Sequence, residues 1–382
     1  MAWANWSGSV ACEPWRLAAP ADEAEVARLV AEAAAGGREV RVVGTGHSFT
    51  PLCATDGLLL SLDALQGVAQ ADATFATVLA GSKISALGAP LQAAGLALTN
   101  QGDVDVQSIG GALGTGTHGT GRTLANMSAA VVGLRVVGEG GAMVDIDDAE
   151  LLRAARVSMG MFGVIVAARL RAMPAYRLHE HCWELAVDQA FAELPELIAR
   201  HRHCEFFWRP GADACDMKTL HPTAAVATDR PGERIDWSWR IFPSVRARKF
   251  NEMEYAVPAA AGPDCFFALR RLMRQRHPDV AWPIEYRTLA PDDAMLSPAQ
   301  FRPSVTLSIH QAAELPHEAF FRDAEAIFRA AGGRPHWGKV HYLTARDLAA
   351  LYPDYDRFRA LRRAFDPKGR FMNGYLRTLF PV

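Results

Sequence analysis

The feature that most constrains this chain is a pair of glycine-rich segments. The β-branched stretch REVRVVG (38–44) predicts a strand that runs directly into GTGHS (44–48). The second segment, NQGDVDVQSIGGALGTGTHGTG (100–121), has neither helical nor strand periodicity and is predicted to be a loop. Glycine lets backbone N–H groups approach a ligand closely, and consecutive N–H groups form a nest for an anion. Two such loops would fit around one pyrophosphate.

Two familiar phosphate-binding motifs do not match these loops. A dinucleotide-binding fingerprint needs a helix directly after its glycines, whereas GTGHSF is followed by Thr50, Pro51 and another predicted strand at 58–65. A P-loop needs the triplet GK[ST], which the sequence lacks. A nucleotide-type cofactor and plain tight turns therefore both stay open as explanations of the glycines.

We expect no metal site. His47 lies at the tip of the first loop without a second ligand nearby in the sequence, and a loop histidine is commonly a structural hydrogen-bonding residue. We expect His118, in the second segment, to hydrogen-bond within its own loop. The six cysteines are scattered without a CxxC pair, which argues against a structural zinc site and against a disulfide framework.

Length and charge limit the class of protein. A chain of 382 residues exceeds what one hydrophobic core usually organises, so two domains are expected. Strands and helices alternate up to about residue 176, which predicts an α/β layer. A formal net charge of -2 gives no electrostatic basis for binding nucleic acid. Because we find no signal peptide and no apolar run of membrane-spanning length, we expect a soluble cytoplasmic protein.

Polar residues on two predicted strands of the second half are candidates for chemistry. IEYR places Glu285 and Arg287 two residues apart, so their side chains point to the same face of a strand. On SVTLSIHQ (304–311), Ser308 and His310 share a face with Thr306 in the same way.

Each candidate also has an ordinary structural explanation. Glu285 and Arg287 would serve equally as a solvated cross-strand ion pair, and His310 as a hydrogen-bonded core histidine. Lys339, in RPHWGK, follows a predicted helix end and would be a surface lysine, although its aromatic and glycine neighbours favour burial. The residues by themselves leave these alternatives open.

Several motifs in a fixed order make the chain resemble the vanillyl-alcohol-oxidase type of FAD-binding protein, also called PCMH-type. They are GTGHS, GDVDVQSIGGALGTGTHGTG, GMFGVIVAARL, EFFWRPGADACDMK, EYAVP, IEYR, RPHWGKVHYL and FDPKGRFMNGYL. The resemblance covers nearly the whole chain and points to the sugar-1,4-lactone oxidase and alditol oxidase group. It implies an α+β fold with an FAD-binding domain (1–173), an α+β substrate (cap) domain (174–335) and a C-terminal segment (336–382) returning to the flavin and the FAD domain.

The resemblance also implies how FAD would be held. In oxidases of this family the histidine of the GHS motif carries FAD covalently, and that position is His47 here. The two loops would cradle the pyrophosphate and the edge of the isoalloxazine ring. The implied cofactor-binding residues are Gly44, Thr45, Gly46, His47, Ser48, Gly102, Asp103, Ser108, Gly111, Gly114, Thr115, Gly116, Thr117, His118, Gly119, Gly163, Ile165 and Asn373.

Two adjacent positions bear on the electron acceptor and the substrate. Gly102 falls where family oxidases tend to have a glycine facing the flavin C4a atom, and the missing Cβ leaves room for dioxygen. Turn geometry is the alternative reason for a glycine there. Asp103 falls where alditol oxidases carry a substrate-contacting serine, and this departure favours a lactone or another sugar.

The implied catalytic residues are Glu285, Arg287, His310, Lys339 and Ser308. The implied reaction is oxidation of an aldono-1,4-lactone (L-gulono-, L-galactono- or D-arabinono-1,4-lactone) by hydride transfer to flavin N5, followed by reoxidation with dioxygen to hydrogen peroxide. Arg287 and Lys339 would stabilise the developing alkoxide, and Glu285 would fix a substrate hydroxyl. His310, or alternatively Lys339, would accept the proton.

Other functions are possible on the same fold. A lactone dehydrogenase would pass its electrons to a cytochrome, a quinone or a dye, and an alditol oxidase would act on xylitol or sorbitol. A non-enzymatic flavin- or nucleotide-binding module and the NADPH-using cell-wall reductase of this fold are disfavoured by the E-x-R pair and by HWGK. The sequence leaves the oligomeric state open.

Overall fold

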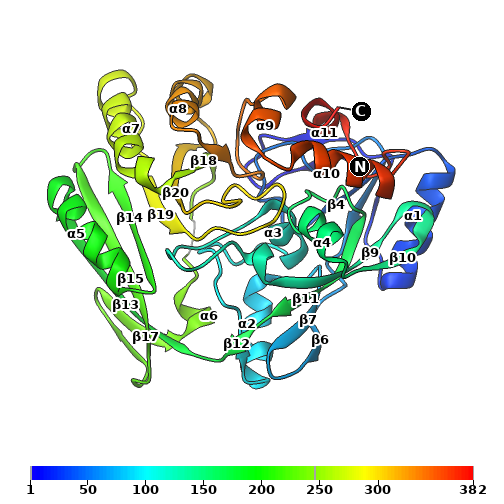
Figure 1. Ribbon diagram of the computed structural model, residues 1–382, viewed down its shortest axis with the longest axis horizontal. Coiled ribbons are helices and arrows are strands. Elements are labelled where there is room, and N and C mark those ends of the chain that lie inside the picture. Colours follow the sequence, from blue (N-terminus) through cyan, green and yellow to red (C-terminus); the bar gives the residue numbers. More distant parts are fainter. Residues whose placement is uncertain (1, 245–246, 382) are drawn as a thin grey trace.

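Short β-branched strands in the first 171 residues form two main sheets. The structure is a computed structural model that describes residues 2–244 and 247–381 (Figure 1). A three-stranded parallel sheet has the order β3-β5-β4, and a five-stranded antiparallel sheet has the order β10-β9-β11-β7-β6. Their strands are β3 (Arg16–Ala18), β4 (Val40–Val43), β5 (Leu58–Ser61), β6 (Val68–Ala71), β7 (Phe75–Leu79), β9 (Val131–Val137), β10 (Met143–Ile146) and β11 (Val164–Arg171).

The first loop joins two parallel neighbours without a helix. The element after β4 is β5, and the two strands pair in parallel with Val40 opposite Leu58. The absence of a helix after GTGHS, predicted from the sequence, is therefore confirmed. Asp22 caps helix α1 by accepting from the backbone N–H of Glu25. The helices of this part are α1 (Glu23–Ala35), α2 (Ile84–Ala93), α3 (Ile109–Thr115) and α4 (Ala149–Ala155).

Helix α3 corrects the prediction that residues 100–121 form a loop throughout. Ile109, Ala112 and Leu113 are buried on its inner side, so three apolar side chains offset the low helix propensity of the glycines around them. Gly116 then ends the helix in the left-handed conformation, at a φ of 75°.

The second half of the chain builds one antiparallel sheet of nine strands. Its order is β16-β17-β13-β15-β14-β19-β20-β18-β21. The strands are β13 (Arg177–Ala186), β14 (His203–Arg209), β15 (Ala214–Thr223), β16 (Thr228–Arg230), β17 (Glu233–Trp237), β18 (Phe250–Pro258), β19 (Ile284–Leu289), β20 (Ser304–Ala312) and β21 (Arg334–Pro335). Two pairs of short strands complete the sheets: β1 (Trp3–Ala4) with β2 (Ala11–Cys12), and β8 (Leu96–Ala97) with β12 (Met173–Pro174).

One face of the nine-stranded sheet is apolar and is covered by helices. Figure 1 shows α5 (Val187–Arg200), α7 (Gly262–Arg276) and α8 (Glu318–Ala330) along its outer side. Phe206 of β14 packs against Phe266 of α7, and Tyr255 of β18 stacks on Phe328 of α8 at a ring separation of 4.8 Å. The short helix α6 (Ser238–Ile241) lies in the connection between β17 and β18.

The opposite face of the sheet meets the N-terminal part of the chain. The backbone N–H of Gly121 donates to the Thr288 carbonyl at 2.9 Å, and the Thr120 hydroxyl donates to the Cys204 carbonyl at 2.7 Å. The second glycine-rich segment therefore lies directly against β14 and β19. Because side chains alternate along each strand, this face carries the polar residues of β18, β19 and β20.

The C-terminal residues pack back onto the first loop. The Phe49 N–H donates to the Gly338 carbonyl at 2.7 Å, and the Val40 N–H donates to the Arg370 carbonyl at 2.8 Å. Three helices follow this contact: α9 (Ala345–Leu351), α10 (Tyr355–Phe365) and α11 (Gly374–Leu379). Among the residues described, none of the helices combines the length and the apolarity needed to cross a membrane.

Candidate active site

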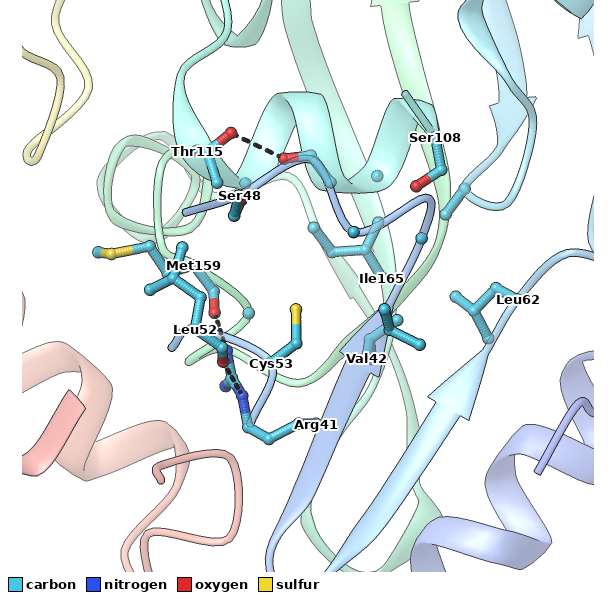
Figure 2. Close-up of a pocket in the computed structure, with 18 of the residues that line it drawn as sticks. Arg41, Val42, Ser48, Leu52, Cys53, Leu62, Ser108, Thr115, Met159 and Ile165 are labelled. Atoms are coloured by element: carbon cyan, nitrogen blue, oxygen red, sulfur yellow. Dashed lines mark hydrogen bonds between the residues drawn. The ribbon is translucent and has the colours of Figure 1, made fainter. Parts of the chain in front are cut away.

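A cavity of about 1100 Å³ lies between the loop after β4, helix α3 and the segment that leads into β11. Figure 2 shows apolar side chains such as Val42, Leu62 and Ile165 around this space. The cofactor-binding residues expected from the sequence that line it are Gly44, Thr45, Gly46, His47, Ser48, Ser108, Gly111, Gly114, Thr115, Gly163 and Ile165.

The first loop presents its backbone to this cavity. None of the hydrogen bonds among the described residues uses the backbone N–H groups of 45–48 as donors. A Cβ on Gly44 would lie 1.9 Å from the Ser108 hydroxyl oxygen, so only glycine allows the two loops to approach this closely. Free N–H groups beside apolar walls fit a ligand that combines phosphates with flat rings.

The turn between β1 and β2 forms hydrogen bonds with the same loop. The Trp6 N–H donates to the Gly46 carbonyl at 2.8 Å, and the Asn5 side-chain amide donates to the Ser48 carbonyl at 2.9 Å. The Trp6 ring stacks on the His47 imidazole, with ring centroids 4.8 Å apart. Burial lowers the pKa of His47 to about 4, with the Lys339 ammonium acting in the same direction. His47 is therefore a neutral imidazole held in a fixed plane at neutral pH.

Arg41 ties three segments together at the wall of the cavity. Its guanidinium donates to the carbonyls of Leu52 at 2.7 Å, Met159 at 2.6 Å and Phe371 at 2.5 Å. Figure 2 shows the first two of these bonds. Burial lowers the pKa of Arg41. The three carbonyls accept hydrogen bonds from its buried guanidinium. The wall of the cavity is thus assembled from distant parts of the chain.

A second cavity of about 590 Å³ adjoins the first, because His47 and Gln107 line both. The buried side-chain oxygen of Gln107 has no hydrogen-bond partner among the described residues, which leaves it available to a ligand at the junction. The expected residues that line the second cavity are Gly102, Asp103, Thr117, His118, Glu285, Arg287, His310 and Lys339.

The register of the large sheet explains how the catalytic candidates meet. Glu285 on β19 lies opposite Ser308 on β20, and on the other side of β20 Ser308 lies opposite Glu254 on β18. His310 lies opposite Glu252 in the same way. The solvated ion pair considered for Glu285 is excluded, because its side chain is only 5% exposed. Ser308 is buried beside the cavity without lining it, and its hydroxyl has no partner within the described part of the chain.

Buried ion pairs neutralise the acids of this cavity. Arg287 donates to Glu254 at 2.9 Å and lies 3.3 Å from a Glu285 carboxylate oxygen. The Lys339 ammonium contacts Glu252, so Lys339 is not a free surface lysine. Burial raises the pKa of Glu285 to about 8 against the opposing effect of Arg287. For Glu252, burial also raises the pKa, but Lys339 and His310 outweigh it and bring the value below its ordinary range.

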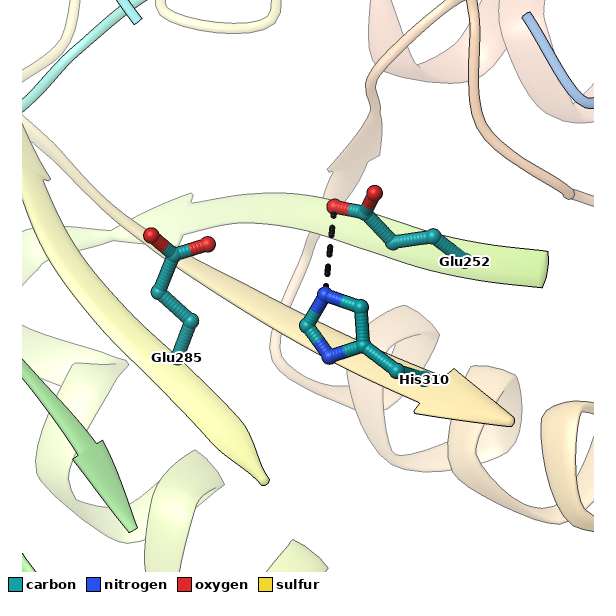
Figure 3. Close-up of side chains that lie close together, drawn as sticks. All are labelled: Glu252, Glu285 and His310. Atoms are coloured by element: carbon teal, nitrogen blue, oxygen red, sulfur yellow. Dashed lines mark ion pairs between the residues drawn. The ribbon is translucent and has the colours of Figure 1, made fainter. Parts of the chain in front are cut away.

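His310 is oriented by a backbone carbonyl. Its Nδ1 lies 3.1 Å from the Pro283 oxygen, which can only accept a hydrogen bond, so Nδ1 is the donor of this contact. Figure 3 shows Nε2 directed at Glu252, 3.7 Å from a carboxylate oxygen, with Glu285 on the other side. One ligand atom from each of Glu252, Glu285 and His310 lies within 4.8 Å of the others. Lys339 contacts Glu252 and Arg287 lies 3.3 Å from Glu285, so each of the two acids already faces a cation.

Sequence reasoning missed several residues of the second cavity. They are Gln107, Glu252, Glu254 and His336, together with the cross-loop role of His118. The alternation in FNEMEYAVP, which places two acids on one face of a strand, is the signal that would have identified Glu252 and Glu254. The Nδ1 of His118 makes the expected local contact by donating to the Gly119 carbonyl at 2.8 Å, but its Nε2 lies 2.8 Å from Glu254.

Three residues expected at the cofactor line neither cavity. Gly116 ends α3, and Gly119 lies against the Gln101 carbonyl, where a Cβ would approach it to 2.3 Å. Asn373 caps α11, and its side-chain amide donates to the carbonyls of Pro51 and Ala54, each at 2.7 Å. These residues shape the loops around the cavities rather than their surfaces.

Comparison with known proteins identifies the family of this chain. Residues 14–147 match the family model of the FAD binding domain, and residues 223–379 match that of D-arabinono-1,4-lactone oxidase. The L-gulono-1,4-lactone dehydrogenase of Mycobacterium tuberculosis is 37% identical over 99% of this chain and 98% of its own length. This chain belongs to the sugar-lactone oxidase and dehydrogenase family of FAD-dependent enzymes. It is an oxidoreductase acting on CH–OH groups.

Relatives within and beyond the sugar-lactone family share the architecture. The alditol oxidase of a Streptomyces species is 31% identical over 98% of both chains. The crystal structure of cholesterol oxidase from B. sterolicum matches with a TM-score of 0.88 at 18% identity, covering 100% of this chain and 96% of that one. The α+β fold of the vanillyl-alcohol-oxidase type is thereby confirmed. FAD is the cofactor of this family, and the first cavity, with its free N–H groups and apolar walls, fits it.

Proposed function

We propose that this protein oxidises an aldono-1,4-lactone, such as L-gulono-, L-galactono- or D-arabinono-1,4-lactone, and passes the electrons to dioxygen with formation of hydrogen peroxide. The observation that carries the proposal is the junction of the two cavities at His47. A cavity that fits FAD opens there into a buried, charged cavity of a size suited to a small sugar. FAD, when bound, accepts the hydride of the substrate C–H bond and transfers the electrons onward.

We propose that His47 carries FAD covalently. A nucleophilic nitrogen must be unprotonated, and the low pKa of His47 keeps its lone pair available at neutral pH. Stacking on Trp6 limits the rotation of the imidazole. We further propose that residues 1–173 form the FAD-binding domain, 174–335 the substrate domain, and 336–382 a segment that returns to the FAD domain. Its cytoplasmic location stays a prediction from the sequence.

Two cations of the second cavity would bind the substrate oxygen that loses its proton. Arg287 and Lys339 line the second cavity and are held by carboxylates, so they need no rearrangement when negative charge develops on the substrate. Glu285, protonated below about pH 8, would donate a hydrogen bond to a second hydroxyl.

His310 is the proposed proton acceptor. The Pro283 carbonyl accepts from its Nδ1–H, which directs Nε2 into the cavity, and an imidazole can take up a proton near neutral pH. The rival, Lys339, contacts the Glu252 carboxylate directly, whereas Nε2 of His310 lies 3.7 Å from it. The looser contact of His310 supports it over Lys339.

A dehydrogenase is the second candidate, because the relative at 37% identity is named L-gulono-1,4-lactone dehydrogenase. Gly102 supports the oxidase instead. It lines the second cavity at a negative φ, so the backbone does not require glycine there. A Cβ would lie 3.2 Å from the His118 carbonyl and fill space that dioxygen needs.

Substrate reduction and acid precipitation test the proposal together. We expect anaerobic L-gulono-1,4-lactone to bleach the yellow holoenzyme faster than xylitol does, and air to restore the colour with formation of peroxide. Acid should leave the yellow colour in the pellet for the wild type and release it for His47→Ala. A protein that stays colourless with added FAD would refute the whole proposal. Slow recovery in air, with rapid transfer to a dye, would establish the dehydrogenase.

Gly102→Ala tests the path of dioxygen. The added methyl group should slow reoxidation by air at least about tenfold, since a free-energy change of about 1.4 kcal/mol suffices for that factor. Reoxidation by a dye at the protein surface should change by less than about twofold. Gly211→Ala is the control. Gly211 has open space around it and, like Gly102, does not have a positive φ. Equal rates with air in the wild type and Gly102→Ala would contradict the proposed oxygen site.

A further inference from the structure

A single carboxylate oxygen joins the second glycine-rich segment to the catalytic strand. Glu254 is 1% exposed on β18. Its Oε1 lies 2.8 Å from the Nε2 of His118 and 2.9 Å from an Nη2 of Arg287. All three side chains line the second cavity. Glu254 therefore connects the loop at the cofactor cavity with β19, which carries the catalytic candidates.

The hydrogen-bond partners of His118 determine its protonation. Its Nδ1 lies 2.8 Å from the Gly119 carbonyl, which can only accept, so Nδ1 carries a hydrogen. Its Nε2 faces Glu254, which is ionised, because Arg287 and His118 outweigh burial and hold the pKa of that carboxyl well below its usual range. An ionised carboxylate also only accepts, so Nε2 carries a second hydrogen.

The other charged and titratable groups around this pair do not disturb the arrangement. His336 lies near His118, with ring centroids 5.9 Å apart, and burial lowers the pKa of His336 to about 3, so it is neutral. Lys339 is paired with Glu252, which lies two residues before Glu254 on the same face of β18. Arg287 shares its charge between Glu254 and Glu285.

We propose that His118 carries a hydrogen on both ring nitrogens, and is thus a cation in the wall of the catalytic cavity, and that Glu254 is the positioning residue that accepts from its Nε2 and aims Arg287. A fixed cation in a buried wall favours negative charge that develops beside it. The inference rests on the proposed function only for its consequence in catalysis; the charge of His118 is independent of the substrate.

Nitrogen-15 NMR of the holoenzyme with labelled histidine tests the charge directly. The signal that disappears in His118→Gln should have both ring nitrogens in the imidazolium range at neutral pH. In Glu254→Gln the same signal should move to the neutral imidazole range, because the amide removes the charge that retains the second proton. A neutral His118 in the wild type would overturn the inference, and this outcome can be read even if Glu254→Gln does not fold.

A redox equilibrium tests the consequence for the cofactor. In His118→Gln, the equilibrium constant for reduction of bound FAD against a reference dye should fall at least about tenfold, because a positive charge in the wall of the site favours the electron-rich reduced form. Glu180→Gln is the matched control, because it removes a buried acid paired with Arg234 on the same sheet and away from both cavities. The control should leave the equilibrium and the His118 signal unchanged.

The two possible failures are distinguishable. A chain that binds no FAD would refute the proposed function, whereas the NMR signal of His118 would still report its charge. A yellow protein that oxidises its lactone, but whose His118→Gln variant keeps the wild-type redox equilibrium, would refute this inference alone.

Discussion

Glu285 experiences two opposing effects on its charge. Burial raises its pKa to about 8, whereas the Arg287 guanidinium, 3.3 Å away, favours the ionised form. Burial prevails because Arg287 is shared with Glu254, whose oxygen is closer, at 2.9 Å. Two acids beside one cation thus differ in charge at neutral pH: Glu254 is a carboxylate that holds the cation, and Glu285 is an acid that can donate a hydrogen bond.

Glu285→Gln tests this difference through pH. Between the ordinary value of 4.5 and about 8, the folded wild type retains a proton that the unfolded chain releases, so its stability falls as pH rises through that window. The amide does not titrate. The melting temperature of Glu285→Gln relative to that of the wild type should therefore rise as the pH increases from 4.5 to 8. Thermal denaturation of the holoenzyme measures this difference.

Catalysis should show the same distinction. Glu285→Gln keeps a hydrogen-bond donor, so its KM at neutral pH should stay within about threefold of the wild type. Glu285→Ala, which removes the donor, should raise KM about tenfold, as expected for the loss of about 1.4 kcal/mol. If the melting temperatures of Glu285→Gln and the wild type differ by the same amount at pH 5 and at pH 8, Glu285 is not neutral.

Individual elements were predictable where their pattern was local. β19 occupies Ile284–Leu289, the strand predicted from IEYRTL, and its two-residue period places Glu285 and Arg287 on one face. Helix α3 was missed because its glycines have low helix propensity. Its three buried apolar residues stabilise the helix only through packing, which the sequence does not show. Glu252 and Glu254 were missed because acids that alternate with apolar residues usually mark the solvent-exposed side of a strand. In β18 both faces are buried, so the acids lie in the interior instead.

The N-terminal strands β1 and β2 form an element whose purpose is visible only in the fold. The Asn5 side-chain oxygen accepts from the N–H groups of Gly8 at 2.9 Å and Val10 at 3.0 Å, while its amide nitrogen donates to Ser48. One 5%-exposed side chain therefore shapes the turn and attaches it to the loop that contains His47.

Asn5→Ala should loosen the His47 loop. Leaving these buried groups without partners should cost about 1–3 kcal/mol in the free energy of unfolding. The fraction of FAD that stays in an acid pellet should fall together with the melting temperature. Glu13→Ala, at an exposed position just after β2, is the control and should change neither measurement. Full retention of FAD by Asn5→Ala would show that the N-terminal strands do not position His47.

At the scale of the whole molecule, the motif order gave the family and the cofactor, but not the way in which the site is assembled. GTGHS, THGTG and IEYR are recognisable separately, and their meeting depends on contacts between residues far apart in the chain, such as His118 with Glu254. The bond from Thr50 to the Trp337 carbonyl, at 2.8 Å, is one such contact. Spacing along the chain contains no information about these distances, because they follow from how the large sheet packs on the N-terminal part.

Arg41 offers the sharpest test of that assembly, since its guanidinium joins the first loop, the segment before β11 and the C-terminal segment at the FAD cavity. A lysine has one nitrogen and cannot reach three carbonyls in different directions. Arg41→Lys should therefore lose at least about 2 kcal/mol of folding free energy, because buried carbonyls are left without donors. Calorimetry of Arg41→Lys should show a lower melting temperature, and dialysis in a His47→Ala background should show weaker retention of FAD. Arg28→Lys, which alters only exposed pairs with Glu25 and Glu32, should match its parent in both. If the two lysine variants behave alike, the three segments are held together by apolar packing, and Arg41 only fills a space between them.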